Sequence, residues 1–373
     1  MNHDKGLRAE IDHLNTRLDA LQSELIARAG YDGINLATQT LGARSINGQH
    51  NYNYLGQRLS DYEIALSNIK QLGYYIGLME AEKLAGRSGR EFGQSRDSLP
   101  SKLCTQQDCE SDWYLYWLDR LQVPFTYHRK WWEFAYVAQQ LLAHGMLCEG
   151  RHGLGFGCGE EPLPSLFASF GASILATDLS AEETEAGGQE WQATGQFADG
   201  LVERFRKEKW CPEPEKLARI GYEDVNMNAI PRHLAGRFDF CWSACALEHI
   251  GSIELGLQFI ENSMATLRPG GVAVHTTEFN LEDGETIDNC MTVLFQKEHM
   301  LALQDRLETK GFLVKPFDFD AGGRVLDGLF DIPPWPWDVA KLNWRMLDCM
   351  THLKRSIGGF RCTSVAITVV KPD

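Results

Sequence analysis

Closely spaced glycines and one acidic residue are the parts of this sequence best suited to hold a ligand. Gly155, Gly157 and Gly159 alternate with larger residues in the run GFGCGE. Glycine lets the backbone turn sharply and approach a ligand that side chains would exclude. Asp178 follows 19 residues after Gly159, and its carboxylate can accept two hydrogen bonds from a ribose diol. The spacing predicts a nucleoside site, with a helix N-cap as the alternative role for Asp178.

The same glycines do not fit a dinucleotide site. Such sites carry the pattern G-x-G-x-x-G, whose backbone receives a pyrophosphate at the start of a helix. In the frame that begins at Gly155 the last glycine is replaced by Glu160. A carboxylate would repel the phosphates there, so we do not expect hydride transfer with a nicotinamide cofactor.

Short apolar runs alternate with helical stretches from residue 152 onward, and they would position these residues. The runs 152–156, 173–178, 237–243 and 271–279 suit buried strands. Residues 253–267 suit a one-faced helix that ends at Pro269-Gly270-Gly271. Strand, helix and strand in this order indicate a doubly wound α/β sheet, which binds ligands beyond the carboxyl ends of its strands.

Five segments in order resemble the class I S-adenosylmethionine-dependent methyltransferases, over roughly residues 150 to 370. They are GFGCGEE, ATDLS, EDVNMNAIP, FDFCWSACALEHI and LRPGGVAVHTTEF. The resemblance implies a Rossmann-like, mostly parallel sheet of seven strands and S-adenosyl-L-methionine as the cofactor. It implies that the cofactor contacts Gly155, Phe156, Gly157, Gly159, Glu160, Asp178, Leu179, Asn226, Met227, Ser243, Ala244 and Cys245.

A narrower resemblance concerns the acceptor. The segments HRKWWEF, GFGCGEEPLP and AVHTTEFN are similar to bacterial methyltransferases associated with surface-polysaccharide biosynthesis. This likeness implies methylation of an oxygen on a saccharide or glycan precursor. The alternatives are O- or N-methylation of a small natural-product scaffold, or a cofactor-binding scaffold without turnover.

Two positions depart from the family pattern. The family commonly carries an acid two residues before the first glycine of the loop, to meet the cofactor's ammonium, and this chain has Gly153. Glu160 or Glu161 could supply that carboxylate instead. Asn226 stands where the adenine-facing acid is expected; its side-chain carbonyl can accept from an amino group, and Asp224 is the competing candidate.

Methyl transfer to a hydroxyl needs a base, and histidine is the usual one. His249 follows the fourth strand of the resemblance, and His275 lies within the fifth. Glu278 could orient either histidine or act itself. The alternatives are that His275 points into the core and that His249 only shapes its loop.

The first 149 residues are expected to be helical. Leu7, Ile11, Leu14 and the leucines that follow to Leu25 form a short a/d seam, so residues 1–28 are predicted to be a coiled-coil or amphipathic helix that joins copies of the chain. Residues 29–149 are predicted to be a helical cap and lid, and residues 150–373 the methyltransferase domain. Arg129 and Trp132 are the predicted lid residues, with a packed joint against the sheet as the alternative.

Composition narrows the partners of this 373-residue chain. Its net charge of −15 disfavours nucleic acid, because the phosphate backbone would be repelled. No apolar run is long enough for a membrane span, and the N-terminus lacks a signal peptide, so we expect a cytoplasmic protein with reduced cysteines. No spacing of acids, histidines or cysteines requires a metal. The predicted partner is a small-molecule or glycan acceptor.

Overall fold

The computed structural model describes residues 52–84, 86–87, 95–179, 202–332 and 351–373. The chain forms two compact units, residues 1–69 and 70–373. Helix α2 (Tyr52–Glu82) runs from the first unit into the second. The predicted helix at residues 1–28, and the association of chains that depends on it, lie outside the described residues.

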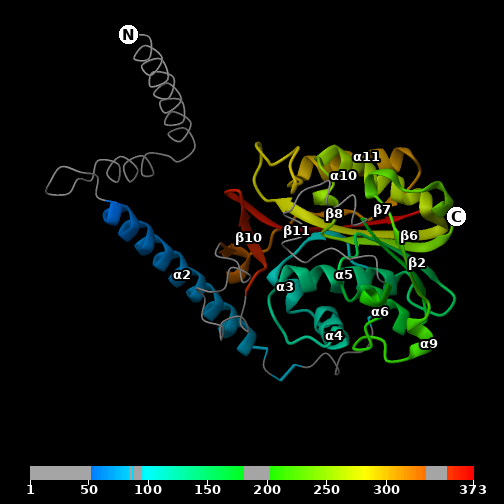
Figure 1. Cartoon of the computed structure of the whole chain (residues 1–373), viewed down its shortest axis with the longest axis horizontal. Coiled ribbons are helices and arrows are strands. Elements are labelled where there is room, and N and C mark those ends of the chain that lie inside the picture. Colours follow the sequence, from blue (N-terminus) through cyan, green and yellow to red (C-terminus); the bar gives the residue numbers. More distant parts are fainter. Residues whose placement is uncertain (1–51, 85, 88–94, 180–201, 333–350) are drawn as a thin grey trace, which may run out of the picture. The chain divides into compact units, whose positions relative to one another are not determined.

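The second unit is built on one large sheet (Figure 1). Five neighbouring strands are parallel, in the order β4-β3-β2-β5-β6. They are β2 (His152–Phe156), β3 (Ser173–Asp178), β4 (Ile220–Asp224), β5 (Phe238–Ala244) and β6 (Leu267–Asn280). The long strand β11 (Phe360–Val370) then pairs antiparallel with β6. The predicted doubly wound, mostly parallel architecture is confirmed.

Short strands enlarge the sheet beyond the seven expected, to eleven among the described residues. They are β1 (Ser101–Leu103), β7 (Leu313–Val314), β8 (Phe317–Asp318), β9 (Phe330–Asp331) and β10 (Lys354–Ile357). Three of them, β1, β7 and β10, pair directly with β11. Strands of two to four residues carry too little periodicity to be recognised in a sequence.

The order of the strands creates the crevice in which such sheets bind ligands. From β2 the chain steps outward to β3 and β4, and it then returns to place β5 on the other side of β2. The connections after β2 and β5 therefore leave the carboxyl edge of the sheet in opposite directions. This switch point is the expected binding position.

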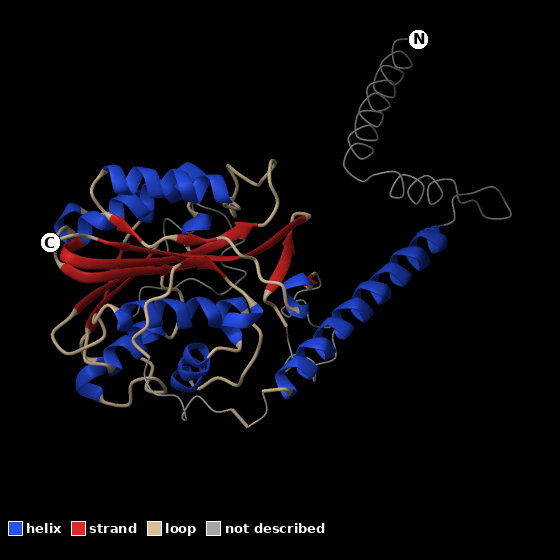
Figure 2. Ribbon diagram, turned by 180° about the vertical axis from the view of Figure 1, so that it is seen from behind, coloured by secondary structure: helices blue, strands red, loops and turns tan. Residues whose placement is uncertain are grey.

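Helices cover both faces of the sheet (Figures 1 and 2). On one face lie α4 (Asp112–Leu121), α5 (Arg129–Ala143), α6 (Leu163–Ser169) and α9 (Pro214–Leu217); on the other lie α10 (Ile253–Ser263) and α11 (Lys297–Thr309). Successive side chains of β5 alternate between the two cores: Phe240 and Trp242 join the first, and Cys241 joins the second. This alternation is the period of two of a strand that is buried on both faces.

Helices α4 and α5, which precede β2, belong to the same compact unit as the sheet. Trp132 and Tyr136 of α5 are fully buried in the core that the sheet shares. His128 caps α5, because its Nδ1 accepts a hydrogen bond from the amide N–H of Lys130 at 3.0 Å. The short helices are α3 (Gln106–Cys109), η2 (Val202–Phe205), η3 (Met227–Ala229), η4 (Arg232–Leu234), η5 (Leu247–His249), η6 (Met264–Thr266) and η7 (Val325–Gly328).

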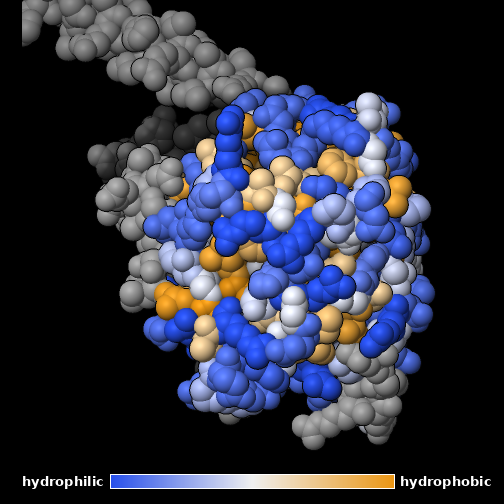
Figure 3. All heavy atoms as spheres, turned by 90° about the vertical axis from the view of Figure 1, so that its right-hand side faces the viewer, coloured by the Kyte–Doolittle hydropathy of each residue, from blue (hydrophilic) through white to orange (hydrophobic). Residues whose placement is uncertain are grey.

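The surface in Figure 3 is mainly hydrophilic, and its hydrophobic residues form small separate groups. Scattered apolar residues are usual on a protein surface. Among the described residues no helix has the length and hydropathy needed to cross a membrane.

Candidate functional site

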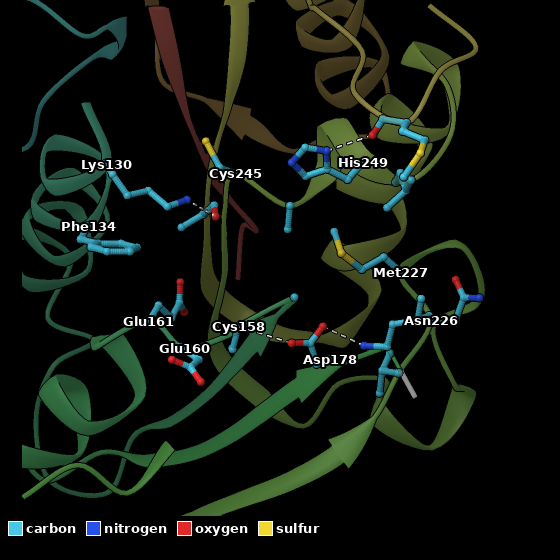
Figure 4. A pocket seen from close by; sticks show the side chains of 18 of the residues that line it. Lys130, Phe134, Cys158, Glu160, Glu161, Asp178, Asn226, Met227, Cys245 and His249 are labelled. Atoms are coloured by element: carbon cyan, nitrogen blue, oxygen red, sulfur yellow. Dashed lines mark hydrogen bonds between the residues drawn. The ribbon is translucent and has the colours of Figure 1, made fainter. Parts of the chain in front are cut away.

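A cavity of about 970 Å³ lies at the carboxyl edge of the sheet, at the switch point between β2 and β5. Figure 4 shows Lys130, Phe134 and Glu161 on one side of it and Asn226 and Met227 on the other. Of the predicted site residues, it is lined by Gly157, Gly159, Glu160, Asp178, Leu179, Asn226, Met227, Ala244, Cys245 and His249. These residues come from loops that follow four different strands.

The loop after β2 presents bare backbone to the cavity. Gly157 and Gly159 have φ values of 58° and 50°, in the left-handed region that favours glycine. A Cβ at Gly157 would lie 2.7 Å from the Cβ of Ala246. The amide of Cys158 donates to the carbonyl of Thr177 at 3.0 Å, which ties the loop to β3. The loop can therefore approach a ligand closely only with glycine at position 157.

Asp178 ends β3 and faces the same cavity. One carboxylate oxygen accepts from the amide of Gly159 at 2.9 Å, and the other accepts from the amide of Leu179 at 2.8 Å. The two amides fix the orientation of the Asp178 carboxylate, whose oxygens are hydrogen-bond acceptors. The arrangement suits a diol.

Asn226 and Met227 begin the 3₁₀ turn η3 and line the cavity beyond Asp178. The amide of Val225 donates to the main-chain carbonyl of Asp178 at 2.8 Å, so this turn is fixed to the end of β3. The Oδ1 of Asn226 accepts from the amide of Asn228 at 2.9 Å. Asp224, the competing candidate, is exposed, does not line the cavity and accepts from the hydroxyl of Tyr222 at 2.6 Å.

The absence of an acid at position 153 has a steric cause. A Cβ at Gly153 would lie 2.3 Å from the Cζ of Phe240, and a Cβ at Gly155 would lie 2.4 Å from the Cζ2 of Trp242. The aromatic rings of β5 thus occupy the space in which side chains of β2 would lie. Gly155 belongs to this packing, and Phe156 is buried in the core on the other face of the sheet, against Phe259; neither residue lines the cavity.

Glu161 provides a buried carboxylate on the cavity wall. Its Oε1 accepts a 2.6 Å hydrogen bond from the indole Nε1 of Trp242. Burial raises the pKa of Glu161 to about 8, and the bond from Trp242 opposes this rise only in part. Glu160, its neighbour, is exposed and pairs with Arg204 at 2.9 Å.

Helix α5 lines the cavity with a different face from the one predicted. Lys130, Trp131 and Phe134 contribute to the wall. Trp132 is fully buried, with its indole N–H donating to Asp108 at 3.1 Å. Arg129 is buried and pairs with Glu133 at 2.9 Å. The two predicted lid residues therefore lie outside the cavity, because each step along a helix turns a side chain by about 100°.

His249 is the histidine that reaches the cavity. Its Nδ1 lies 3.0 Å from the main-chain carbonyl oxygen of Met291 (Figure 4). Since a carbonyl only accepts, Nδ1 carries the proton in the neutral ring and the lone pair lies on Nε2. Nε2 is 3.8 Å from Oε1 of the buried Glu248.

His275 is fully buried between β6 and α10, outside the cavity. Its Nδ1 lies 2.8 Å from the hydroxyl of Ser243, and its Nε2 lies 3.3 Å from the hydroxyl of Ser263. Burial lowers the pKa of His275 to about 3. Ser243, predicted to contact the cofactor, is likewise buried and bonded to this ring. Neither residue lines the cavity, so neither is placed to touch a ligand there.

Glu278 is buried beneath the cavity in a cluster of ion pairs. Its Oε1 lies 2.5 Å from Arg129 and 2.9 Å from Arg355. Donor atoms of Cys245, Glu248 and Glu278 lie within 4.8 Å of one another, as metal ligands would. The two guanidinium groups already neutralise Glu278, and a guanidinium N–H of Arg129 donates to the Cys245 thiol at 3.3 Å. This arrangement disfavours an additional cation.

Several residues of the cavity wall belong to no motif in the sequence. Trp131, Phe134 and Trp210 add aromatic rings, and residues 289–291 close the wall beside His249. The i,i+4 spacing of Lys130 and Phe134 could have placed both on one helical face. Trp210 stands in an irregular segment, where the indole N–H donates to the carbonyl of Leu121 at 2.6 Å.

Comparison with known proteins gives only remote likenesses. No protein-family model matches the chain, and no curated protein matches it. A structure from Galdieria sulphuraria, described as a sarcosine dimethylglycine methyltransferase, is similar with 15% identity over 70% of this chain and 99% of that chain, at a TM-score of 0.39. An S-adenosylmethionine-dependent methyltransferase from Mesorhizobium loti is similar with 16% identity over 64% and 98% of the two chains, at a TM-score of 0.33.

The magnesium protoporphyrin IX methyltransferase of Synechocystis, which contains bound SAM, is similar with 14% identity over 64% of this chain and 77% of that chain, at a TM-score of 0.33. Likenesses at such TM-scores are too slight to establish a fold or a function. The fold is instead identified by the order of the strands, and the candidate site by the residues of the cavity.

Proposed function

We propose that this protein is a methyltransferase that moves a methyl group from S-adenosyl-L-methionine to an oxygen of a saccharide or glycan precursor. The observation that carries the proposal is the convergence, in one cavity at the switch point of the sheet, of the bare backbone at Gly157 and Gly159 with Asp178 and Asn226. S-adenosylmethionine supplies, when bound, a methyl group on a positively charged sulfur that a nucleophile can displace.

The residues along the cavity wall suit, one after another, the ribose and the base of such a nucleoside. The carboxylate of Asp178 is the type of acceptor that a ribose diol needs, and the side-chain carbonyl of Asn226 is the type that an adenine amino group needs. The apolar side chain of Met227 follows Asn226 in the chain and can pack against the face of a base. The glycine loop lets the main chain approach the ligand closely, as a Cβ at position 157 would not permit.

His249 is the proposed general base. A hydroxyl acceptor loses its proton as its oxygen forms the bond to the methyl carbon, and Nε2 of His249 takes that proton. The carbonyl of Met291 holds the other ring nitrogen in its protonated form and fixes the orientation of the ring. Alignment of the acceptor in line with the bond that breaks supplies the rest of the rate enhancement.

The aromatic wall supports the saccharide assignment. Trp131 and Trp210 offer ring faces and edges on which the apolar face of a sugar can stack. A small natural-product scaffold is the second candidate acceptor, favoured by Met227, Ile250 and Met291, which make much of the opposite wall apolar.

Incubation with S-adenosylmethionine labelled in its methyl group tests the proposal. Sugar nucleotides or glycan precursors should gain the label, and Asp178→Ala should lose most affinity for S-adenosylhomocysteine by calorimetry. Label on non-sugar acceptors alone would remove the saccharide assignment. A chain that binds the nucleoside but labels no acceptor would be a scaffold, and one that binds no nucleoside would contradict the cofactor assignment.

A further inference from the structure

We propose that Glu161 and Lys130 together recognise the α-amino-acid end of the cofactor, with Glu161 pairing to its ammonium group and Lys130 to its carboxylate. This inference rests on the proposed function. It concerns the side of the cavity that carries Phe134, away from Asn226 and Met227 (Figure 4). A zwitterion needs one group of each charge close together, and this side of the wall provides both.

Glu161 is the candidate for the ammonium group because the packing of β5 against β2 leaves no room for an acidic side chain on β2 itself. Phe240 and Trp242 fill the space above Gly153 and Gly155. The indole N–H of the buried Trp242 donates at 2.6 Å to Oε1 of Glu161, which lines the wall. Phe240 therefore excludes an acid at position 153, and the indole of Trp242 orients the acid that replaces it.

Lys130 is the one Lys or Arg among the described residues that line the cavity. Its side chain is 37% exposed, and its Nζ donates to the carbonyl of Ala244 at 3.1 Å and to Glu133 at 3.4 Å. An ammonium has three N–H donors, so one more acceptor can be bound. The bond to Ala244 directs the charge to the end of β5, beside the glycine loop.

Recognition by a buried acid makes binding depend on pH. Burial raises the pKa of Glu161 to about 8, so the carboxyl is mostly protonated at neutral pH before a cation arrives. A hydrogen bond with Cys158 of the loop and the charge of Lys130 on α5 lower the pKa of Glu161, whereas the charge of Asp178 on β3 raises it. Lys207 adds a further positive charge nearby. Binding of an ammonium selects the ionised form, so affinity should fall about tenfold per pH unit below about pH 8.

Calorimetry with two nucleosides tests the inference. S-adenosylhomocysteine carries the amino-acid end, whereas 5′-methylthioadenosine keeps the adenine, ribose and sulfur and lacks it. We expect Glu161→Gln and Lys130→Met each to weaken S-adenosylhomocysteine about tenfold to hundredfold and to leave methylthioadenosine within about twofold. Retained binding of methylthioadenosine also shows that each variant is folded.

Proton release gives an independent readout. Titration at pH 7 in two buffers of different ionisation enthalpy should show about one proton released per S-adenosylhomocysteine bound to the wild-type protein, and about none with Glu161→Gln. Equal discrimination between the two nucleosides in Glu161→Gln and wild type would overturn the inference and leave the proposed function intact. So would loss of discrimination in Glu160→Gln alone. Failure of the wild type to bind either nucleoside would overturn both.

Discussion

His249 and His275 lie on either side of one boundary, the carboxyl edge of the sheet. His275 is inside β6, opposite Ser243 of β5, and its ring packs edge-on against Phe259 of α10. His249 follows the end of β5 in η5 and faces the cavity. Both sequence contexts resemble active-site segments, yet the two rings have different surroundings.

The difference teaches that a few residues along the chain decide whether an imidazole can do chemistry. A base must reach its substrate and must be able to take up a proton at the working pH. Burial among Ser243, Ser263 and Phe259 satisfies the ring of His275 and holds it neutral. His249 lies beyond the end of β5, and its side chain therefore contacts the cavity.

The largest effect that would sharpen this comparison is on turnover. His249→Ala should lower kcat by about a hundredfold or more, because it removes the proposed base, and should leave the affinity for S-adenosylhomocysteine near that of the wild type. Single-turnover methylation and calorimetry measure the two quantities. Unchanged turnover would show that another group accepts the proton.

The next effect concerns stability. His275→Ala should lower the free energy of unfolding by about 3 kcal/mol, because it leaves a cavity and removes the hydrogen-bond partner of the buried Ser243 hydroxyl. Urea unfolding measures this loss. His233→Ala is the matched control, since His233 is exposed and pairs with Glu223, and it should change stability by about 0.5 kcal/mol or less. Loss of kcat in folded His275→Ala would restore this residue as a catalytic candidate.

The third effect is on the pH dependence of stability. The pKa of His275 is about 3 in the folded protein and near 6.5 in the unfolded chain. Above pH 6.5 the ring is neutral in both states and its burial is not penalised. As the pH falls from about 6.5 toward 3, the unfolded chain takes up a proton that the folded protein excludes, so stability drops by about 1.4 kcal/mol per pH unit from this group.

Unfolding of wild type and His275→Gln at several pH values isolates this contribution, because the other titrating groups are common to both proteins. The difference in unfolding free energy between the two should shrink as the pH falls below 6.5. A constant difference would mean that His275 is protonated in the folded protein.

The smallest effect concerns Ser243. Ser243→Ala removes the 2.8 Å hydrogen bond to His275 and should cost about 1 kcal/mol of stability. Affinity for S-adenosylhomocysteine should not change, because the hydroxyl points away from the cavity wall. A marked loss of affinity would place Ser243 in contact with the cofactor, as the sequence suggested.

The sequence predicts best what depends on local order along the chain. Glycines after one strand, an acid at the end of the next and a turn after the third must meet at one edge of a parallel sheet, and Gly157, Asp178 and Met227 do so. The predicted strands around them agree with β2, β3, β5 and β6 to within a few residues.

What the sequence does not predict depends on the phase of helices and on contacts between distant segments. Every face of α5 near its start carries charged or aromatic residues, so the pattern does not reveal that Lys130 faces the cavity while Arg129 faces Glu278. The role of Glu161 depends on Trp242, which lies 81 residues away along the chain. Neither contact produces a periodic pattern of residues from which it could be predicted.

The contacts of Gly153 with Phe240 and of Gly155 with Trp242 constrain how this lineage can change. A Cβ at either glycine would come within 2.4 Å of an aromatic carbon, so an acid could stand at position 153 only if a smaller side chain replaced the ring at 240. Substitutions on β2 and β5 should therefore occur as compensating pairs among descendants. Relatives with an acid at 153 should carry small residues at 240 and be free to lose the carboxylate at 161.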